Sequence, residues 1–462
     1  MKFVLPAAST LLALALSVPP VFAQEPRSAF LGGVPSGTPT AQPLALGILD
    51  AITRSLEHNL GLLNAEERAG REEGSRWMAL ADLLPNVSGR IAENRQKVNL
   101  AAFGFPLPAG VPSLAGPFNV FDARLSVSQS VFDLRAINAE KAETHNLAAA
   151  RLNVKSARDL VVLVSGNLYL QSLAAAARVQ SAEAQVQTAQ AVFDQATRMK
   201  ENGIVAGIEV LRAEVQLGSE KQRLTAARND LEKTKLQLAR VIGLPAAQTF
   251  TLSDELPYVP FPTMSLEEAL AQSYRSRPDY LAAQERLKAA QAERQAAVGE
   301  WLPSVRVTAD YGRIGLTPGD AKGTYSVAGS LNVPVFNGGR TKGRIIQADA
   351  DVRLRQSELD DLKAGIDFEL RGEFLDLKAS TEQLQVASRS RDLAAQQLTQ
   401  ARDRFAAGVA SSIEVVQAQE AVATSSEQYI GALYRFNIAK ALLARELGAA
   451  EEMARQFLGG VR

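Results

Sequence analysis

The sequence carries two copies of one long pattern. Residues 203–213 (GIVAGIEVLRA) return as residues 408–418 (GVASSIEVVQA), and the spacing of 205 that relates them holds through position 243. Residues 84–87 (LPNV) return as residues 302–305 (LPSV) at a spacing of 218. The difference between the two spacings places about 13 extra residues in the first copy, between positions 87 and 203. Solenoid modules have roughly 20 to 50 residues, so we interpret the chain as a duplicated half-protein.

The N-terminus has the features of an export signal. Lys2 supplies a positive charge, residues 3–18 are mostly apolar, and residues 21–23 (VFA) form a small-residue cleavage site. We therefore predict a signal peptide over residues 1–23 and a flexible segment over residues 24–43.

The composition excludes several kinds of site. Cysteine is absent, so the chain has no disulfide, no thiolate metal site and no lipidated N-terminal cysteine. The 50 basic residues equal the 50 acidic residues, which gives no indication of nucleic-acid binding. No phosphate-binding loop, nucleophile elbow or zinc motif occurs, and we predict no cofactor, no metal and no catalytic activity. No apolar run of about 18 residues follows the signal, so we expect no transmembrane helix.

Proline placement predicts two long helices. All 20 prolines lie outside residues 118–244 and 335–462, and a proline inside a helix costs about 3 kcal/mol. Within these windows apolar residues recur three and four positions apart, which is the pattern of a coiled-coil seam. We predict long helices over residues 137–202 and 344–407. The first would extend about 99 Å at a rise of about 1.5 Å per residue, which is longer than a compact core requires.

Four shorter helices accompany the long ones, over residues 46–83, 208–242, 266–301 and 413–447. We expect them to stack end to end in pairs, with 208–242 and 266–301 beside one long helix and 413–447 and 46–83 beside the other. Gly203 and Gly408 stand where each long helix ends, as glycine does at the C′ position.

Period-two alternation predicts four strands in two hairpins, over residues 86–132 and 304–336. In the second hairpin Val305, Val307, Ala309 and Tyr311 alternate with polar residues, and the first hairpin has a serine-rich second face. Residues 101–117 are rich in proline and glycine, and we expect them to form the longer loop that the first copy requires.

The alternation has two interpretations. One is a half-buried sheet packed on a helix, which is the commoner arrangement in exported proteins. The other is a lipid-facing barrel wall around a wet lumen, which explains the serine-rich face and the lack of a short amphipathic helix to cover the sheet. Because a barrel needs about eight strands, a sheet of four that spans a membrane requires several chains.

The sequence resembles the TolC-like outer membrane factor family. The resemblance rests on the duplicated helix–strand–strand–helix layout, the Leu-Pro entries at 84–85 and 302–303, the exit PVFNGGR at 334–340 and the glycine-containing hairpin tips. It implies a mainly α-helical fold with a transmembrane β-barrel portion. Each chain of a homotrimer would give four strands to a 12-stranded barrel in the outer membrane lipid. The helices would form a coiled-coil tunnel across the periplasm.

The resemblance also implies a division of the chain and a function. The first structural repeat covers residues 44–244, a linker covers 245–265, the second repeat covers 266–448, and a C-terminal tail covers 449–462. One departure is that Leu60 stands where the second copy has Pro278. The implied function is that of a passive outer membrane channel in a tripartite efflux or type I secretion system. Its partners would be a periplasmic membrane fusion (adaptor) protein and an inner-membrane RND, ABC or MFS transporter.

The alternative is a soluble periplasmic coiled-coil scaffold, which explains the signal and the helices but leaves the four strands without a purpose. An exported enzyme would need a polar constellation that the sequence lacks. Efflux of small molecules and secretion of proteins use similar ducts, so the sequence does not define the substrate.

The helix tips carry the candidate site residues, because in the family the tips form the periplasmic entrance and contact the adaptor. The candidates for the constriction are Glu209, Glu414, Gln417 and Arg212. The candidates for adaptor contact are Gly203, Ile204, Val205, Gly207, Gly408, Val409, Ser411 and Ser412. Residues 411–414 (SSIE) also have the pattern of a capping box, in which case Glu414 only caps its helix.

Aromatic residues mark the junctions between strands and helices. Phe132, Phe336 and Trp301 lie there, where they would form an interfacial girdle or plug the junction core. Trp77 lies inside a predicted helix, and we expect it to pack there.

Overall fold

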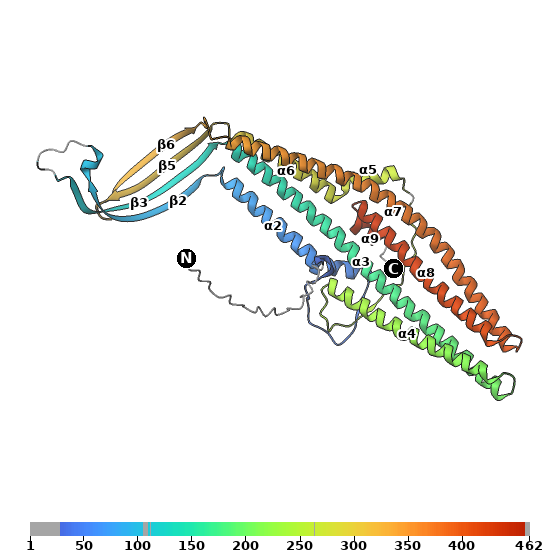
Figure 1. The fold of residues 1–462 in the computed structure, drawn as a ribbon. Coiled ribbons are helices and arrows are strands. Elements are labelled where there is room, and N and C mark those ends of the chain that lie inside the picture. The colour runs from blue at the N-terminus through green and yellow to red at the C-terminus, as the bar shows by residue number, and fades with distance from the viewer. Residues whose placement is uncertain (1–27, 105–109, 111, 263, 458–462) are drawn as a thin grey trace, which may run out of the picture.

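The computed structural model describes residues 28–457 except residues 105–109, 111 and 263. The molecule is elongated, with a small β-sheet at one end and two helical hairpin tips at the other (Figure 1). The expected signal peptide lies outside the described residues, as does the end of the expected tail after residue 457.

Two long helices run along most of the molecule, as the proline-free windows predict. They are α3 (Leu134–Glu201, 68 residues) and α7 (Arg340–Ala406, 67 residues). Each ends in a Schellman motif around a glycine in the left-handed region, Gly203 at φ 72° and Gly408 at φ 76°. The Ile204 N–H donates to the Met199 carbonyl at 2.8 Å, and the second copy repeats this contact. The predicted helix stops are therefore confirmed.

Two of the four shorter helices are continuous, and they return from the tips. They are α4 (Gly207–Val241) and α8 (Ser412–Glu446), which pair with α3 and α7 respectively. The other two are each divided, into α1 (Ile48–His58) and α2 (Leu60–Ala81), and into α5 (Leu266–Ser276) and α6 (Pro278–Gly299).

The expectation of continuous helices over 46–83 and 266–301 is thus wrong at one position in each copy. At Arg277 the cause is Pro278, which disfavours helical geometry in the residue before it. At Asn59 there is no following proline, and the side chain produces the break instead. Its Oδ1 accepts from the Gly61 N–H at 2.8 Å and its Nδ2 donates to the Phe30 carbonyl at 2.8 Å. Both breaks have extended backbone, with ψ near 120°.

Helix pairing differs from the expectation on two points. α3 packs against α2, α4 and α6, and α6 lies between α3 and α7. The expected stacking along one long helix is confirmed for α4 and α6, whereas α5, the first part of the segment 266–301, packs against α7. We expected the helix over 46–83 to lie beside the second long helix, but within the chain α2 lies against α3. One side of α2 consequently has no helical neighbour among the described residues of its own chain.

The middle of the molecule contains a two-stranded parallel sheet that the sequence did not predict. Strand β1 (Leu44–Leu46) pairs with β4 (Phe250–Leu252) inside the linker between repeats. Tyr169 of α3 anchors this sheet, because its hydroxyl donates to the Leu46 carbonyl at 2.8 Å and contacts Asp254 Oδ2 at 2.9 Å. Burial raises the pKa of Tyr169.

The segment before β1 makes backbone hydrogen bonds near the ends of two helices. The Val34 N–H donates to the His58 carbonyl at 2.8 Å, and the Ser36 N–H donates to the Gly243 carbonyl at 3.0 Å. Residues 34–36 therefore connect the break between α1 and α2 to the end of α4.

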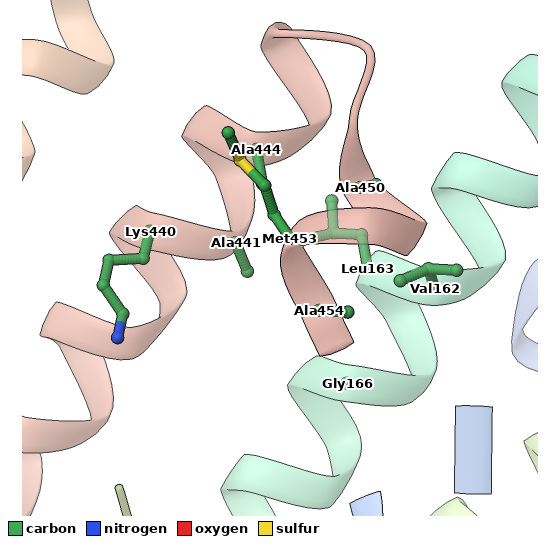
Figure 2. Close-up of a pocket in the computed structure, with 9 residues that line it drawn as sticks. All are labelled: Val162, Leu163, Gly166, Lys440, Ala441, Ala444, Ala450, Met453 and Ala454. Carbon is green, nitrogen blue, oxygen red and sulfur yellow. The ribbon is translucent and has the colours of Figure 1, made fainter. Parts of the chain in front are cut away.

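The expected C-terminal tail contains helix α9 (Ala450–Phe457). Figure 2 shows α9 lying between α3 and α8, with Met453 pointing toward α8. Lys440 of α8 lines the same small pocket, and its Nζ donates to the Val259 carbonyl of the linker at 2.8 Å. Burial lowers the pKa of Lys440 to about 8. The linker and the tail thus both pack on the end of α8.

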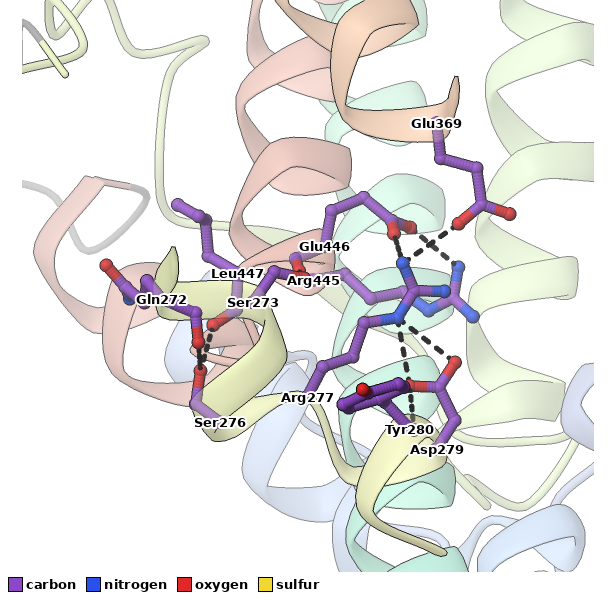
Figure 3. A network of polar contacts seen from close by, with 10 residues as sticks. All are labelled: Gln272, Ser273, Ser276, Arg277, Asp279, Tyr280, Glu369, Arg445, Glu446 and Leu447. Atoms are coloured by element: carbon purple, nitrogen blue, oxygen red, sulfur yellow. Dashed lines mark hydrogen bonds and ion pairs between the residues drawn. The ribbon is translucent and has the colours of Figure 1, made fainter. Parts of the chain in front are cut away.

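A buried polar network holds the break between α5 and α6 to the end of α8 (Figure 3). The Arg277 guanidinium pairs with Glu446, and it lies 2.9 Å from both Asp279 and Glu369. The side chains of Arg277 and Glu446 are only 7% and 5% exposed. Ser273 Oγ also donates to the Glu446 carbonyl at 2.7 Å.

The sheet at the end of the molecule has four antiparallel strands in the order β2-β3-β5-β6. The strands are β2 (Asn86–Asn99), β3 (Leu114–Phe132), β5 (Ser304–Gly315) and β6 (Lys322–Asn332). Both predicted hairpins are therefore present. The extra residues of the first copy are divided between its longer strands and the connection through η2 (Leu100–Phe103), and residues 105–109 and 111 of the expected loop lie outside the described residues.

One face of this sheet is apolar and uncovered. The register pairs Val87 with Val127, and it pairs Tyr311 with both Leu125 and Tyr325. Tyr325 is 78% exposed, and its neighbours on this face are also largely exposed. A sheet packed on a helix would bury these side chains, so that interpretation is wrong.

One helix in the described part of the chain, α3, has an 18-residue window apolar enough to cross a membrane by length and composition. From the sequence we expected no such helix. The window is 56% buried against the rest of the chain, as in a core helix.

Candidate functional site: the helical tips and the two-faced sheet

The two helical hairpin tips are packed against each other near their ends. Met199 and Ala213 of the first hairpin belong to one buried cluster with Phe405, Val415 and Ala418 of the second. The tips therefore form one unit within the chain, and the candidate entrance residues surround this cluster.

Glu209 links the two tips directly. Its Oε2 accepts from the Ser412 N–H at 3.1 Å and from the Ser412 hydroxyl, and its Oε1 accepts from Arg212 Nη1 at 2.7 Å. Ser412 is the first residue of α8, where free N–H groups and the helix dipole favour an anion. The hydrogen bond from the Ser412 side chain is the main cause of a lowered Glu209 pKa. Glu209 of one hairpin thus caps the return helix of the other.

Glu414 has a different environment from the one that the capping-box pattern predicts. The Ser411 side chain makes no capping hydrogen bond, so the box does not form. Glu414 Oε1 instead lies 3.0 Å from Arg404 Nε, near the end of α7. Both side chains are about half exposed. Each of the two candidate carboxylates therefore has an arginine partner in its own chain.

Most of the remaining candidates lie at the surface of the tips. Gln417 is exposed on α8, one turn beyond Glu414. Ile204 is 61% exposed and Val409, its equivalent in the second copy, is 67% exposed. Gly203, Gly207, Gly408 and Ser411 complete the turns around them, Val205 is partly buried, and Ser412 is buried. Two exposed aliphatic side chains at equivalent positions give the tips an apolar contact surface.

Sequence reasoning missed the bond between Glu209 and Ser412 and the pairing of Glu414 with Arg404. The first joins residues 203 positions apart, and no local pattern reports such a contact. One signal was available in the sequence. Ser412 stands at the first position of a return helix, where the backbone N–H groups have no acceptor within the helix and need one from elsewhere.

The sheet at the other end has a polar second face. On it, Arg124 pairs with Asp310 of the neighbouring strand and lies 3.3 Å from Asp122. Ser126, Ser128 and their cross-strand neighbours lie on the same face. Of the junction aromatics, Phe336 is 86%, Trp301 46% and Phe132 42% exposed, which favours the girdle. Trp77 is 58% exposed, so the expectation that it packs inside the chain is wrong.

An apolar outer face, a polar inner face and long helices continuing from the strands define an outer membrane channel protein with a helical extension. The chain belongs to the outer membrane efflux protein family, whose model matches residues 51–244 and 269–449. It is therefore an outer membrane efflux channel protein with a periplasmic tunnel, and the TolC-like resemblance is confirmed.

Among its relatives is the pyoverdine export outer membrane protein OpmQ of Pseudomonas putida. The two are 25% identical over 390 residues, which cover 82% of this chain and 80% of the relative. A membrane protein from Pseudomonas aeruginosa has a similar solved structure, with a TM-score of 0.77, 17% identity, and coverage of 90% of this chain and 100% of that one. The outer membrane protein VceC of Vibrio cholerae gives a TM-score of 0.72 at 20% identity, covering 87% and 96%.

Proposed function

We propose that three copies of this chain form a passive duct that receives substrates from an inner-membrane RND, ABC or MFS transporter through a periplasmic adaptor. Relatives of the chain are outer membrane proteins of efflux systems. The chain contributes no catalysis in this proposal, since the energy for transport comes from the pump. The observation that carries the proposal is the open side of α2, which no helix among the described residues of its own chain covers.

The duplication predicts what covers that open side. Within the chain, Arg76 of α2 donates to Thr144 of α3 at 3.0 Å. Shifting these positions by 218 and 205 gives Arg294 of α6 and Asp349 of α7, which also pair. The α2–α3 contact is thus equivalent to the α6–α7 contact. The chain also has an α3–α6 contact, whose equivalent would join α7 to α2, and α2 does not pack on α7 in the part of the chain that the structure describes.

A second copy can supply the missing contact. In the α3–α6 contact, Arg286 Nη2 donates to Asn153 Oδ1 at 3.1 Å. The equivalent positions are Arg68 on α2 and Glu358 on α7, which are both exposed and have opposite charges. We therefore place α2 of one copy against α7 of the next, with Arg68 beside Glu358. Repetition of this contact closes a ring, and three copies supply the 12 strands that the family resemblance implies.

Engineered disulfides test this arrangement, because the natural chain has no cysteine. Arg68→Cys combined with Glu358→Cys should give, in outer membranes under oxidising conditions, a ladder of linked chains that ends at three. The matched control is Asn153→Cys combined with Arg286→Cys, which should link helices within one chain and leave its mass unchanged. Only single chains in the first variant, from membranes where the control forms its internal bond, would refute the ring.

The tips are the proposed entrance. Glu209, Arg212, Glu414 and Gln417 lie around the tip cluster and would face the constriction or the neighbouring copy, and the exposed Ile204 and Val409 would contact the adaptor. The test is Ile204→Asp with Val409→Asp, which should abolish efflux while the disulfide ladder above is retained. Normal efflux by this variant would remove the tips from the adaptor contact.

A further inference from the structure

The charges of the sheet are unbalanced in a chain whose overall net charge is zero. The strand register decides which of these charges share a face. Arg90 of β2 pairs with Arg124 of β3, and Asp310 of β5 pairs with Ser326 of β6. Following this register across the sheet places four cationic side chains and two acidic ones on the polar face: Arg90, Arg124, Arg306, Lys322, Asp122 and Asp310.

Only one of the four cations is neutralised by ion pairs. Arg124 contacts both acidic side chains, Asp122 and Asp310. Arg90, Arg306 and Lys322 form no ion pair with any residue that the structure describes, and all three are exposed. The face therefore has an excess of two positive charges per chain, and unpaired guanidinium or ammonium groups carry it.

The excess extends to the base of the sheet, where two polar cavities of about 140 and 280 Å³ adjoin through Asp133 and Arg135. Arg306 lines the first cavity, and Arg340 and Arg344 line the second. The two linings together hold four arginines and three carboxylates, Asp82, Asp133 and Glu300. Two of the carboxylates are engaged, since Asp133 caps α3 through the Ala136 N–H at 3.1 Å and Glu300 pairs with Arg344. Arg306 and Arg340 remain without an ion pair among the described residues.

The opposite face of the sheet is apolar, so in a membrane the cationic face lines the lumen. We infer that the barrel lumen of this channel selects anionic solutes over cationic ones, with Arg90 and Arg306 as the main determinants. This inference rests on the proposed duct. A lining with an excess of one sign of charge raises the local concentration of counter-ions of the opposite sign. Three copies would place an excess of six positive charges around one lumen.

Screening sets the conditions under which the preference is visible. The Debye length is about 30 Å in 0.01 M salt and about 3 Å in 1 M salt. Charges on the wall therefore act across the lumen at the lower concentration and are screened near the wall at the higher one. The anion preference should be largest in dilute salt and vanish in 1 M salt, whereas a preference due to pore size would persist.

The experiment is a reversal-potential measurement on purified channels in planar bilayers across a potassium chloride gradient. The natural channel should pass chloride in preference to potassium in dilute salt. Arg90→Gln with Arg306→Gln should lower the chloride-to-potassium permeability ratio several-fold. Asp310→Asn should raise this ratio. The matched control is Arg95→Gln, which removes a cation from the opposite face of β2 and should leave the ratio unchanged.

The outcomes separate the inference from the function on which it rests. Conducting channels that prefer potassium in dilute salt, or a double variant with an unchanged ratio, would overturn the inference and leave the duct intact. An equally large change of the permeability ratio in Arg95→Gln would also overturn the inference, because the selectivity would then depend on the net charge of the sheet and not on the face that lines the lumen. Disulfide-linked trimers that never conduct would overturn the duct itself, and the selectivity with it.

Discussion

Val327 provides the sharpest test that the apolar face of the sheet meets lipid. It is the sixth of the 11 residues of β6, it is 71% exposed, and it pairs with Ala309 of β5. Eleven residues rise about 37 Å, and a strand tilted by about 45° then covers about 26 Å, which matches an apolar band of about 25 Å. Val327 should therefore lie close to the midplane of the membrane.

An arginine at this depth on the lipid face costs about 2 to 4 kcal/mol. This cost corresponds to a loss of roughly 30- to 700-fold in the folding equilibrium. Ala328→Arg is the matched control, because it places the same side chain one residue further on β6, on the lumen face opposite Thr308. The control should assemble almost as well as the natural chain.

The assay is urea titration of the channel refolded into lipid vesicles, read by the change in gel mobility that separates folded from unfolded chains. Val327→Arg should lower the free energy of unfolding by the stated amount, and Ala328→Arg should change it little. Equal losses in both variants, or greater loss in Ala328→Arg, would contradict the assignment of the two faces.

Three further predictions concern the helices. Hydrogen bonds lower the pKa of Glu209 in the folded chain. The ionised side chain therefore stabilises the fold above the pKa of the unfolded chain, and this stabilisation is lost as the pH falls through the lower folded pKa. In thermal melts Glu209→Gln should be less stable than the natural chain at neutral pH and should match it in strong acid. Arg277→Ala leaves Glu446 buried without its main partner and should cost about 3 to 5 kcal/mol of stability in chemical denaturation. Adding Glu446→Gln should restore part of the lost stability, whereas equal losses in the single and double variants would show that packing alone matters. Gly408→Ala should cost about 1 to 2 kcal/mol for its left-handed backbone, and Gly448→Ala should cost clearly more in the same titration, because its Cβ would lie 2.8 Å from the backbone of the α5–α6 break.

The sequence was sufficient for features with a long period. The strand alternation around Val305 and the proline-free windows each extend over ten or more residues, so the hairpins and the long helices were predicted correctly. Neither the β1–β4 sheet nor α9 was predicted. Strands of three residues have no measurable period, and their pairing depends on Tyr169 of a helix more than 100 positions away.

The site was predicted less completely than the fold. The position of Glu209 in the tip was clear from the repeat, but its partner Ser412 lies on the other hairpin. The local capping pattern at residues 411–414 pointed to Ser411, and a contact across the tips replaced it. The two helix breaks show the same limit, because Pro278 reveals one of them locally whereas the break at Asn59 depends on Phe30.

The edge strands of the sheet, β2 and β6, each have one side without a partner strand among the described residues. Unpaired backbone N–H and C=O groups cannot enter hydrocarbon, so a lone chain has no stable way to cross the bilayer. Insertion must therefore accompany association, and the rate of barrel formation should rise more steeply than linearly with subunit concentration. A newly exported chain also presents unpaired strand edges and an apolar face to the periplasm, and both favour aggregation. Its lifetime before assembly is then limited by aggregation, so delivery at low local concentration and protection by chaperones would decide the yield of working channels.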